Sequence, residues 1–246
     1  IAQNSGSKNR LNDVTFINEN IGIAVGEYGI LIKTTDGGLN WTQQSYGTCE
    51  WLQAVFFIND TLGWAVGNDV LLRTYNGGNS WIAQSITNVA ILMDVFFINE
   101  NVGFMVGGFG TSGNKVFKTT NGGITWNDKI LNATPLPQSV FFLNEIVGFI
   151  ACGDGRIKKT SDGGISWNDL TTGTLSGFNQ ICFNQSNVGL AIGTDGLIMR
   201  TTDLGISWIN QQIPDCSGLS GICFINNYAW VIGENGKILF SEDGGI

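Results

Sequence analysis

An octapeptide of the pattern Thr-x-Asp/Asn-Gly-Gly-x-x-Trp recurs along this chain and constrains its fold more than any other feature. Its acidic or amide positions are Asp36, Asn76, Asn121, Asp162, Asp203 and Asp243, and its tryptophans are Trp41, Trp81, Trp126, Trp167 and Trp208. Consecutive copies therefore lie 40, 45, 41, 41 and 40 residues apart. A period of about 41 residues with β-type patterning is typical of β-propeller blades.

Each repeat predicts four short strands. In the first repeat these are residues 14–17, 22–26 and 30–33, followed by a strand that starts at Trp41; they are rich in β-branched and aromatic residues and bounded by Gly and Asn. We therefore expect an all-β, six-bladed propeller of four-stranded antiparallel blades, forming a single domain over residues 1–246. The predicted repeats span about 11–51, 52–91, 92–136, 137–177, 178–218, and 219–246 together with 1–6.

The beginning of the chain matches the fourth strand of a blade. Ile1-Ala2-Gln3 repeats Ile82-Ala83-Gln84, and both tripeptides start 13 residues before the valine of the next first strand. Because an unclosed propeller exposes sheet edges, we expect residues 1 to about 6 to supply the outer strand of the sixth blade, pairing with residues 236–241. The alternative is that the chain is a window from a longer array.

The octapeptide has chemistry that suits a turn. An Asp or Asn side chain accepts backbone N–H groups two residues on, the second Gly permits a positive φ, and the Thr hydroxyl bonds within the turn. The Trp ring is expected to be buried between blades with its N–H paired. We therefore interpret the octapeptide as structural.

The repeat resembles the BNR or Asp-box repeat of sialidases and other secreted propellers. The whole unit is more similar to the photosystem II stability/assembly factor-like family, through residues 14–26, 55–67 and 29–41. The resemblance implies a protein-binding assembly factor of photosynthetic organisms, and similar secreted propellers occur in non-photosynthetic bacteria. We accordingly expect a bacterial protein that is extracellular, at the cell surface or periplasmic.

A meander blade places its second-to-third turns at the end opposite the octapeptides, and we call that end the variable face because its turns differ between repeats. Loops of this kind carry recognition. The candidate binding residues are Glu27, Tyr28, Tyr46, Trp51, Asp69, Phe109, Asp154, Phe178, Asp195 and Glu234. Residues 107–114 and 131–138 are expected to be neighbours and to form a protein-binding patch with Phe109 and Trp51. The carboxylates form a candidate acidic ring for a cation or basic partner, although Asp also favours tight turns with Gly.

Composition narrows the classes of partner. The net charge is −8 with only 12 basic residues, so nucleic acid is not expected as a partner. No apolar run is long enough for membrane insertion, and without histidine we predict no metal or cofactor. The five cysteines are expected to be buried free thiols, with one disulfide such as Cys49–Cys216 as the alternative.

The function predicted from these residues is non-catalytic protein binding, as a scaffold in the assembly of a larger complex. The alternatives are a lectin, with Tyr28, Tyr46 and Trp51 stacking on a glycan, and a sialidase-like glycoside hydrolase. The hydrolase needs an arginine triad or paired carboxylates, and the four arginines offer no triad. A basic residue precedes five of the six octapeptides and is expected either to form a basic ring for an anionic partner or to occupy a solvated position beside the Asp. These residues are Lys33, Arg73, Lys118, Lys159 and Arg200.

Overall fold

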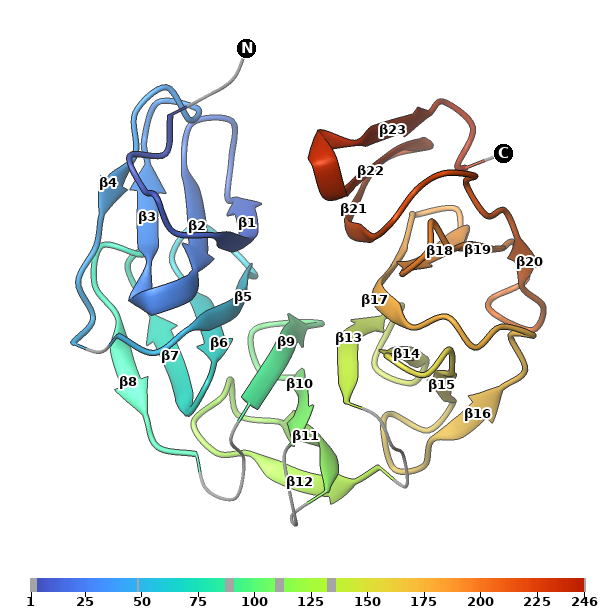
Figure 1. The fold of residues 1–246 in the computed structure, drawn as a ribbon. Coiled ribbons are helices and arrows are strands. Elements are labelled where there is room, and N and C mark those ends of the chain that lie inside the picture. Colours follow the sequence, from blue (N-terminus) through green and yellow to red (C-terminus); the bar gives the residue numbers. More distant parts are fainter. Residues whose placement is uncertain (1–3, 48, 87–90, 109–112, 132–135, 246) are drawn as a thin grey trace. The chain divides into compact units, whose positions relative to one another are not determined.

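A computed structural model describes residues 4–47, 49–86, 91–108, 113–131 and 136–245 (Figure 1). The chain divides into two compact units, Ile1–Ile130 and Leu131–Ile246. Besides strands, we note two single-turn 3-10 helices, η1 (Glu27–Gly29) and η3 (Glu234–Gly236).

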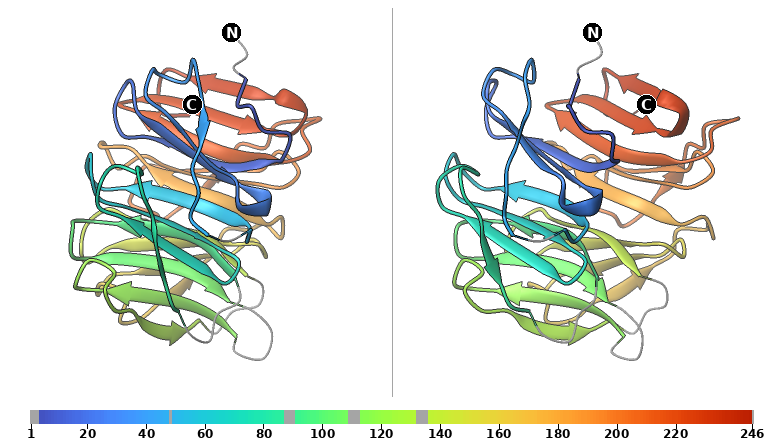
Figure 2. Two further views of the ribbon diagram at one scale, coloured as in Figure 1. Left: turned by 90° about the vertical axis from the view of Figure 1, so that its left-hand side faces the viewer. Right: turned by 60° about the vertical axis from the view of Figure 1, so that its left-hand side comes forward.

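The first unit contains three four-stranded antiparallel sheets, each a meander in chain order. The sheets are β1 (Leu11–Phe16), β2 (Gly22–Gly26), β3 (Leu31–Thr34), β4 (Thr42–Gln43); β5 (Leu52–Phe57), β6 (Gly63–Gly67), β7 (Val70–Thr74), β8 (Ile82–Gln84); and β9 (Ile91–Phe97), β10 (Gly103–Gly108), β11 (Asn114–Thr119), β12 (Asn127–Ile130). Within this unit β1 lies beside β5, and β5 beside β9, so successive sheets stack face to face (Figure 2).

The second unit repeats the plan. Its sheets are β13 (Pro137–Phe142), β14 (Gly148–Cys152), β15 (Ile157–Thr160), β16 (Asn168–Leu170); β17 (Phe178–Phe183), β18 (Gly189–Gly193), β19 (Ile198–Thr201), β20 (Ile209–Asn210); and β21 (Leu219–Ile225), β22 (Tyr228–Gly233), β23 (Ile238–Ser241). Here β13 lies beside β17, and β17 beside β21.

The predicted fold class, a six-bladed β-propeller of four-stranded antiparallel blades, is confirmed. The last sheet has three strands among the described residues. Residues 4–10 form no strand and residues 1–3 lie outside the described part, so closure by the N-terminal segment stays a prediction.

The second strand forms the middle of the core in five of the six blades. In β2, β6, β14 and β18 every residue is buried, because these strands have a sheet neighbour on each side and a further sheet against a face. In the first unit Trp64 of β6 stacks on Phe97 of β9 with ring centroids 3.4 Å apart. The burial of such large rings is the main stabilising contribution to a domain of this kind.

A β-bulge near the start of each first strand shapes the variable face. In the first blade Leu11 pairs with Gly26 and Asp13 with Val25, so one residue is extra. The bulge brings the backbone so close that a Cβ on Gly26 would lie 2.1 Å from the carbonyl oxygen of Arg10. Only glycine fits at this position of the first blade, which explains the glycine that ends β2.

Candidate functional site

The octapeptide forms a turn held by its own side chains. In the first copy the Thr34 hydroxyl donates to Asp36 Oδ1 at 2.8 Å and accepts the N–H groups of Asp36 at 3.3 Å and Gly38 at 2.9 Å. Asp36 Oδ1 accepts the N–H of Asn40 at 2.9 Å, so the side chain reaches four residues on and not the two that we predicted. The three hydroxyl bonds recur in all six copies. The octapeptide is thus a structural element.

Each octapeptide tryptophan packs edge-on against a phenylalanine of the first strand of its own blade. Ring centroids are 5.7–6.1 Å apart in the pairs Phe16–Trp41, Phe57–Trp81, Phe97–Trp126, Phe142–Trp167 and Phe183–Trp208. The prediction that the indole N–H is paired is wrong for Trp81, Trp126, Trp167 and Trp208, whose Nε1 atoms have no partner among the described residues. The packing of these rings, and not a hydrogen bond, therefore accounts for the tryptophan.

The basic residues before the first, fourth and fifth octapeptides connect neighbouring blades. Lys33 Nζ donates to the carbonyl oxygen of Gly77 at 2.8 Å, in the octapeptide of the next blade. In the second unit Lys159 Nζ donates to Leu204 O at 2.6 Å, and Arg200 Nε to Gly244 O at 2.9 Å. Lys33 and Arg73 are 6% exposed. The predictions of a solvated position and of a basic ring for an anionic partner are therefore wrong for these two residues. We call the bond from the basic side chain to a carbonyl oxygen in the octapeptide of the next blade the inter-blade latch.

Replacing Leu204 by glycine should raise the free energy of unfolding by about 0.5–1 kcal/mol. Leu204 occupies the first-glycine position of its octapeptide with φ +60° and is 40% exposed, so its side chain adds strain and little packing. Urea denaturation would measure the change. Leu39→Gly is the matched control, since Leu39 is 75% exposed in another octapeptide, and it should lower stability. Equal destabilisation by both substitutions would contradict the assignment of strain.

The candidate residues of the variable face divide between the two units. Asp69 and Asp195 have φ of +50° and +57°, which explains an Asp at those turns. Asp154 pairs with Arg156 Nε at 3.1 Å, and Glu234 begins η3. The placement of Phe178 in an exposed loop is wrong: the bulge lets β17 start earlier than predicted, and Phe178 is fully buried. Phe109 and residues 132–135 lie outside the described residues, so the patch proposed around them is untested, as is the acidic ring.

Three aromatic candidates in the first unit do come together. The Tyr28 and Trp51 rings meet edge to face with centroids 5.5 Å apart. Tyr28 and Tyr46 line a pocket of about 230 Å³ with Gly29, Gln43, Gln44, Ser45 and Cys49, which we call the aromatic pocket. The Tyr46 hydroxyl donates to the carbonyl oxygen of Glu50 at 3.3 Å. Burial raises the pKa of Tyr46, with smaller contributions from Cys49 and Glu50, so this phenol stays protonated.

Tyr28 occupies an unfavourable backbone conformation. Its φ is +55° and ψ +36°, in the left-handed region that Asn, Asp and Gly tolerate best. At the equivalent position of the sixth blade, η3 has Asn235 with φ +57° and ψ +28°. Yet the Tyr28 side chain is 61% exposed. A strained, exposed aromatic residue is a mark of a binding surface.

The first strands also carry polar contacts that sequence reasoning missed. Asp13 Oδ2 accepts the N–H of Val55 at 2.8 Å, and Asn12 donates to Leu52 O at 2.8 Å, both in the next blade. In the second unit Gln180 Oε1 accepts the N–H of Ile222 at 2.7 Å. The signal in the sequence was a polar residue directly before the first-strand Val or Ile.

The stability of the protein should rise as the pH falls from 7 to 5. Burial raises the pKa of Asp13 from 3.8 to about 6, although hydrogen bonds from the Val55 and Val14 N–H groups lower this pKa in part. The folded state therefore binds this proton more tightly than the unfolded state, and protonation stabilises the fold by about 1 kcal/mol over this interval. Urea denaturation at both pH values checks this, and Asp13→Asn should remove the difference. Asp162 and Asp203, with pKa values of about 2, affect stability only at lower pH. An unchanged pH dependence in the variant would refute the role of Asp13.

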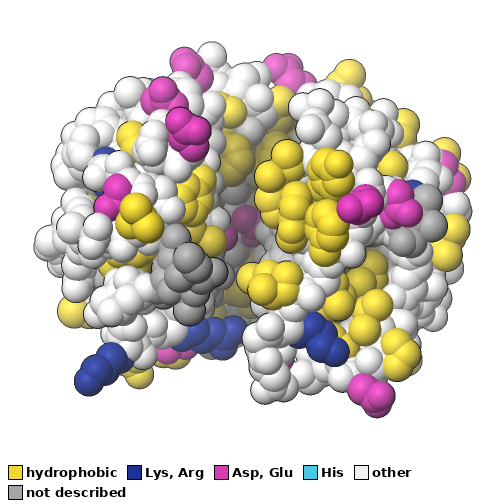
Figure 3. Space-filling model, turned by 90° about the horizontal axis from the view of Figure 1, so that it is seen from above, with side chains coloured by type: hydrophobic (Ala, Val, Ile, Leu, Met, Phe, Trp, Pro, Cys, Tyr) yellow, Lys and Arg dark blue, Asp and Glu magenta, His cyan; other side chains and the backbone are white. Residues whose placement is uncertain are grey.

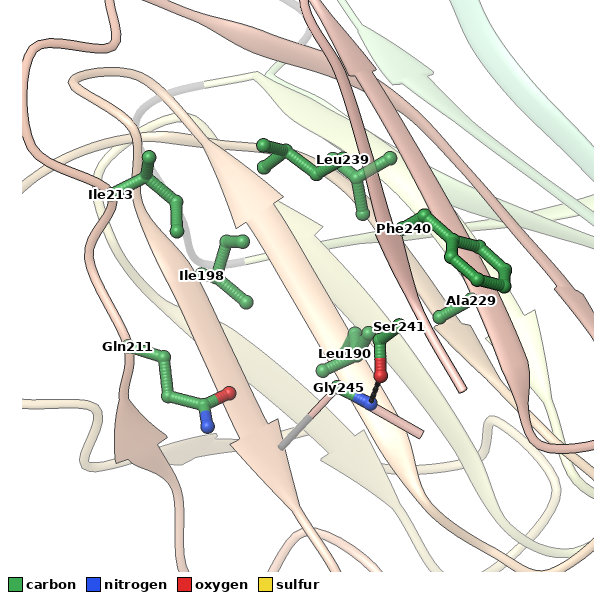
Figure 4. A pocket seen from close by; sticks show the side chains of 10 residues that line it. Leu190, Ile198, Gln211, Ile213, Ala229, Leu239, Phe240, Ser241 and Gly245 are labelled. Atoms are coloured by element: carbon green, nitrogen blue, oxygen red, sulfur yellow. Dashed lines mark hydrogen bonds between the residues drawn. The ribbon is translucent and has the colours of Figure 1, made fainter. Parts of the chain in front are cut away.

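A cavity of about 340 Å³ lies between the fifth and sixth sheets, within the second unit (Figure 4). Ile198 and Ile213 line it from the fifth blade, and Ala229 and Leu239 from the sixth. Ser241 Oγ accepts the Gly245 N–H at 2.7 Å at one end. The lining residues include no acid or base, so this cavity offers no group for proton transfer.

Hydrophobic side chains gather on an exposed face of the last sheet in the second unit (Figure 3). Ile232, Ile238 and Phe240 are 50%, 69% and 52% exposed. The rings of Tyr228 and Phe240 stack with centroids 5.9 Å apart, and the ring centroids of Trp230 and Phe240 are 5.0 Å apart. A face of this composition is typical of a surface that packs against another protein element.

The cysteines and the remaining classes of site can be placed briefly. All five cysteines are free thiols; Cys152 is buried, whereas Cys49 and Cys223 are exposed, contrary to the prediction that they are buried. Among the described residues, no three His, Cys, Asp or Glu side chains are grouped to hold a metal ion. In that same part of the chain, none of the helices has the length and apolar character needed to span a membrane.

Comparison with known proteins places this architecture in a family. A family model described as "Photosynthesis system II assembly factor YCF48" matches residues 3–88 and 165–246. The chain belongs to this family. The predicted resemblance is therefore confirmed, and no curated protein sequence matches the chain at a significant level.

Solved structures similar to this YCF48-family chain show the same fold. One, described as "YCF48 bound to D1 peptide", has a TM-score of 0.75 at 20% identity, covering 96% of this chain and 79% of that one. YCF48 from Cyanidioschyzon merolae has a TM-score of 0.54 at 18% identity, covering 95% of each chain. An ancestral GH74 enzyme has a TM-score of 0.72 at 17% identity, covering 97% of this chain and 39% of that one.

Proposed function

We propose that this chain is a non-catalytic propeller that binds a segment of a partner protein through its variable face, as a scaffold in the assembly of a larger complex. The observation that carries the proposal is the aromatic pocket, where Tyr28 is exposed and strained beside Trp51. Membership of the YCF48 family supports a protein partner, as does the related structure described with a bound D1 peptide. We further propose that it acts outside the cytoplasm, at the cell surface or in the periplasm.

A hydrolytic function is not favoured by the positions of the arginines. Arg73 is buried with its guanidinium 4.4 Å from the Tyr75 ring, and Arg200 is bonded to Gly244 O. Arg156 pairs with Asp154. These contacts commit three of the four arginines to structural partners, which leaves no triad of the sialidase type. The GH74 enzyme is similar to this chain in fold, and that similarity does not carry its activity.

Affinity capture tests the proposal. Immobilised chain should retain one stoichiometric partner from an extract of its own organism, and the purified partner should bind in isothermal titration calorimetry. The double substitution Tyr28→Asn and Trp51→Ser should weaken that binding at least about tenfold. Leu39→Ser, at an exposed residue of the octapeptide end, is the control and should not change it. A glycan-array signal without a protein partner would support the lectin alternative, and turnover of a chromogenic glycoside would support the hydrolase.

A further inference from the structure

We infer that the aromatic pocket binds a cationic side chain, lysine or arginine, from the partner's segment. This inference rests on the proposed function and specifies its chemistry. The size of the pocket is the first argument. At about 230 Å³ it is smaller than the pockets that enclose whole ligands, and it suits a single amino-acid side chain better than an oligosaccharide.

The walls of the pocket supply the groups that a cation prefers. Tyr28 and Tyr46 present aromatic rings, which attract a cation through their negative faces. Gln44 also lines the pocket, and its amide nitrogen lies 3.3 Å from the Thr42 hydroxyl. Among the residues that the structure describes, no lysine or arginine lines the pocket.

The charge around the pocket is complementary to a cation. Glu27 directly precedes Tyr28, and the Glu50 carboxylate is near enough to contribute to the raised pKa of Tyr46. The backbone carbonyl oxygen of Arg10 accepts the Glu27 N–H at 3.0 Å. Lys33 and Arg73 of the same unit are buried toward the octapeptide end. Acidic residues thus adjoin both tyrosines of the pocket, Glu27 next to Tyr28 in the chain and Glu50 through its effect on Tyr46.

The unfavourable backbone conformation of Tyr28 supports a role of its side chain in binding and not in stability. The first-blade turn is Glu27-Tyr28-Gly29 and the sixth-blade turn is Glu234-Asn235-Gly236, in nearly the same conformation. The chain therefore already folds this turn with an asparagine, which tolerates the left-handed region better than tyrosine. The tyrosine at position 28 is explained by what its ring contacts: Trp51 and the pocket.

Side-chain mimics test the inference directly. Nα-acetyl-lysine methylamide and Nα-acetyl-arginine methylamide would be titrated into the ¹⁵N-labelled chain and followed by NMR. Saturable shifts are expected at the Tyr28, Gly29 and Gln44 amides and at the Trp51 indole. The uncharged Nα-acetyl-norleucine methylamide should bind at least about threefold more weakly, and added salt should reduce the difference.

Two variants make the test discriminating. Tyr28→Asn should raise the melting temperature while weakening lysine binding about threefold to tenfold. Glu50→Gln should weaken binding of the cationic mimics and leave that of norleucine unchanged. Equal binding of lysine and norleucine mimics, binding of methyl glycosides instead, or a Tyr28→Asn variant that is less stable but binds normally would each overturn the inference. If a captured partner still depends on Tyr28 while the cationic mimics do not bind, the cation is refuted and the proposed function stands.

Discussion

Substituting valine for Thr74 should lower the free energy of unfolding by about 3 kcal/mol. The Thr74 hydroxyl is completely buried; it donates to Asn76 Oδ1 at 3.0 Å and accepts the N–H groups of Asn76 at 3.3 Å and Gly78 at 3.0 Å. Valine has nearly the same shape but no polar atom. The N–H groups of Asn76 and Gly78 therefore lose their acceptor, and Asn76 Oδ1 keeps only the Ser80 N–H. Each lost bond costs about 1 kcal/mol or more. Urea denaturation, followed by tryptophan fluorescence and by circular dichroism, would measure the loss.

Thr74→Ser is the matched control for this prediction. The sixth octapeptide has Ser241 at this position, and its hydroxyl makes the same three bonds, at 2.6, 3.3 and 2.7 Å. Serine should therefore cost less than about 1 kcal/mol, the price of a missing methyl group. If valine and serine proved equally stable, the hydroxyl would have no role in holding the turn.

Gly67→Ala should destabilise the fold by about 3 kcal/mol and also disrupt the aromatic pocket. A Cβ at residue 67 would lie 1.9 Å from the carbonyl oxygen of Trp51, which accepts the Asn68 N–H at 2.9 Å. The Cβ is held rigidly by the backbone of residue 67 and the oxygen is itself a backbone atom, so the start of β5 must move, and overpacking of this kind is costly. Trp51 then moves away from Tyr28. Thermal unfolding measures the first effect, and the NMR shifts of the Trp51 indole measure the second.

The control for Gly67→Ala separates the effect of a steric clash from that of backbone strain. Gly173 has φ +74° with nothing within 4 Å of its ideal Cβ, so Gly173→Ala carries the backbone strain without a clash. It should cost about 1 kcal/mol and leave the Trp51 signal unchanged. Equal losses for the two substitutions would show that the close approach at Gly67 has no energetic consequence.

Local chemistry explains which features of the fold were predictable. The Thr, Gly and Asp roles in the octapeptide follow from contacts within five residues, so a single repeat suffices to deduce them. The inter-blade latch was missed because Lys33 and Gly77 are 44 residues apart, and strand patterning does not show which carbonyl faces a lysine. The unpaired indole of Trp81 was missed for a similar reason, since it depends on atoms of other strands.

The candidate site was only partly predictable. Aromatic residues in the turns drew attention to Tyr28 and Trp51, but their edge-to-face contact depends on how the first two blades pack. Phe178 was misplaced because a β-bulge adds a residue to the strand, and so shifts its start, without any signature in composition. The polar contact of Asp13 was hidden within the same bulged segment of its own strand.

The direction of the inter-blade latch has a consequence for how such chains diversify. Each observed latch runs from one repeat to the octapeptide of the following repeat, from Lys33 to Gly77, from Lys159 to Leu204 and from Arg200 to Gly244. The first, fourth and fifth repeats thus each carry a donor for the repeat that follows, whereas the sixth has Phe240 at this position. Duplication of one of these three repeats by recombination would form the same latch between the two copies. Genes of this type can therefore change their number of blades in single genetic events without any new contact having to evolve.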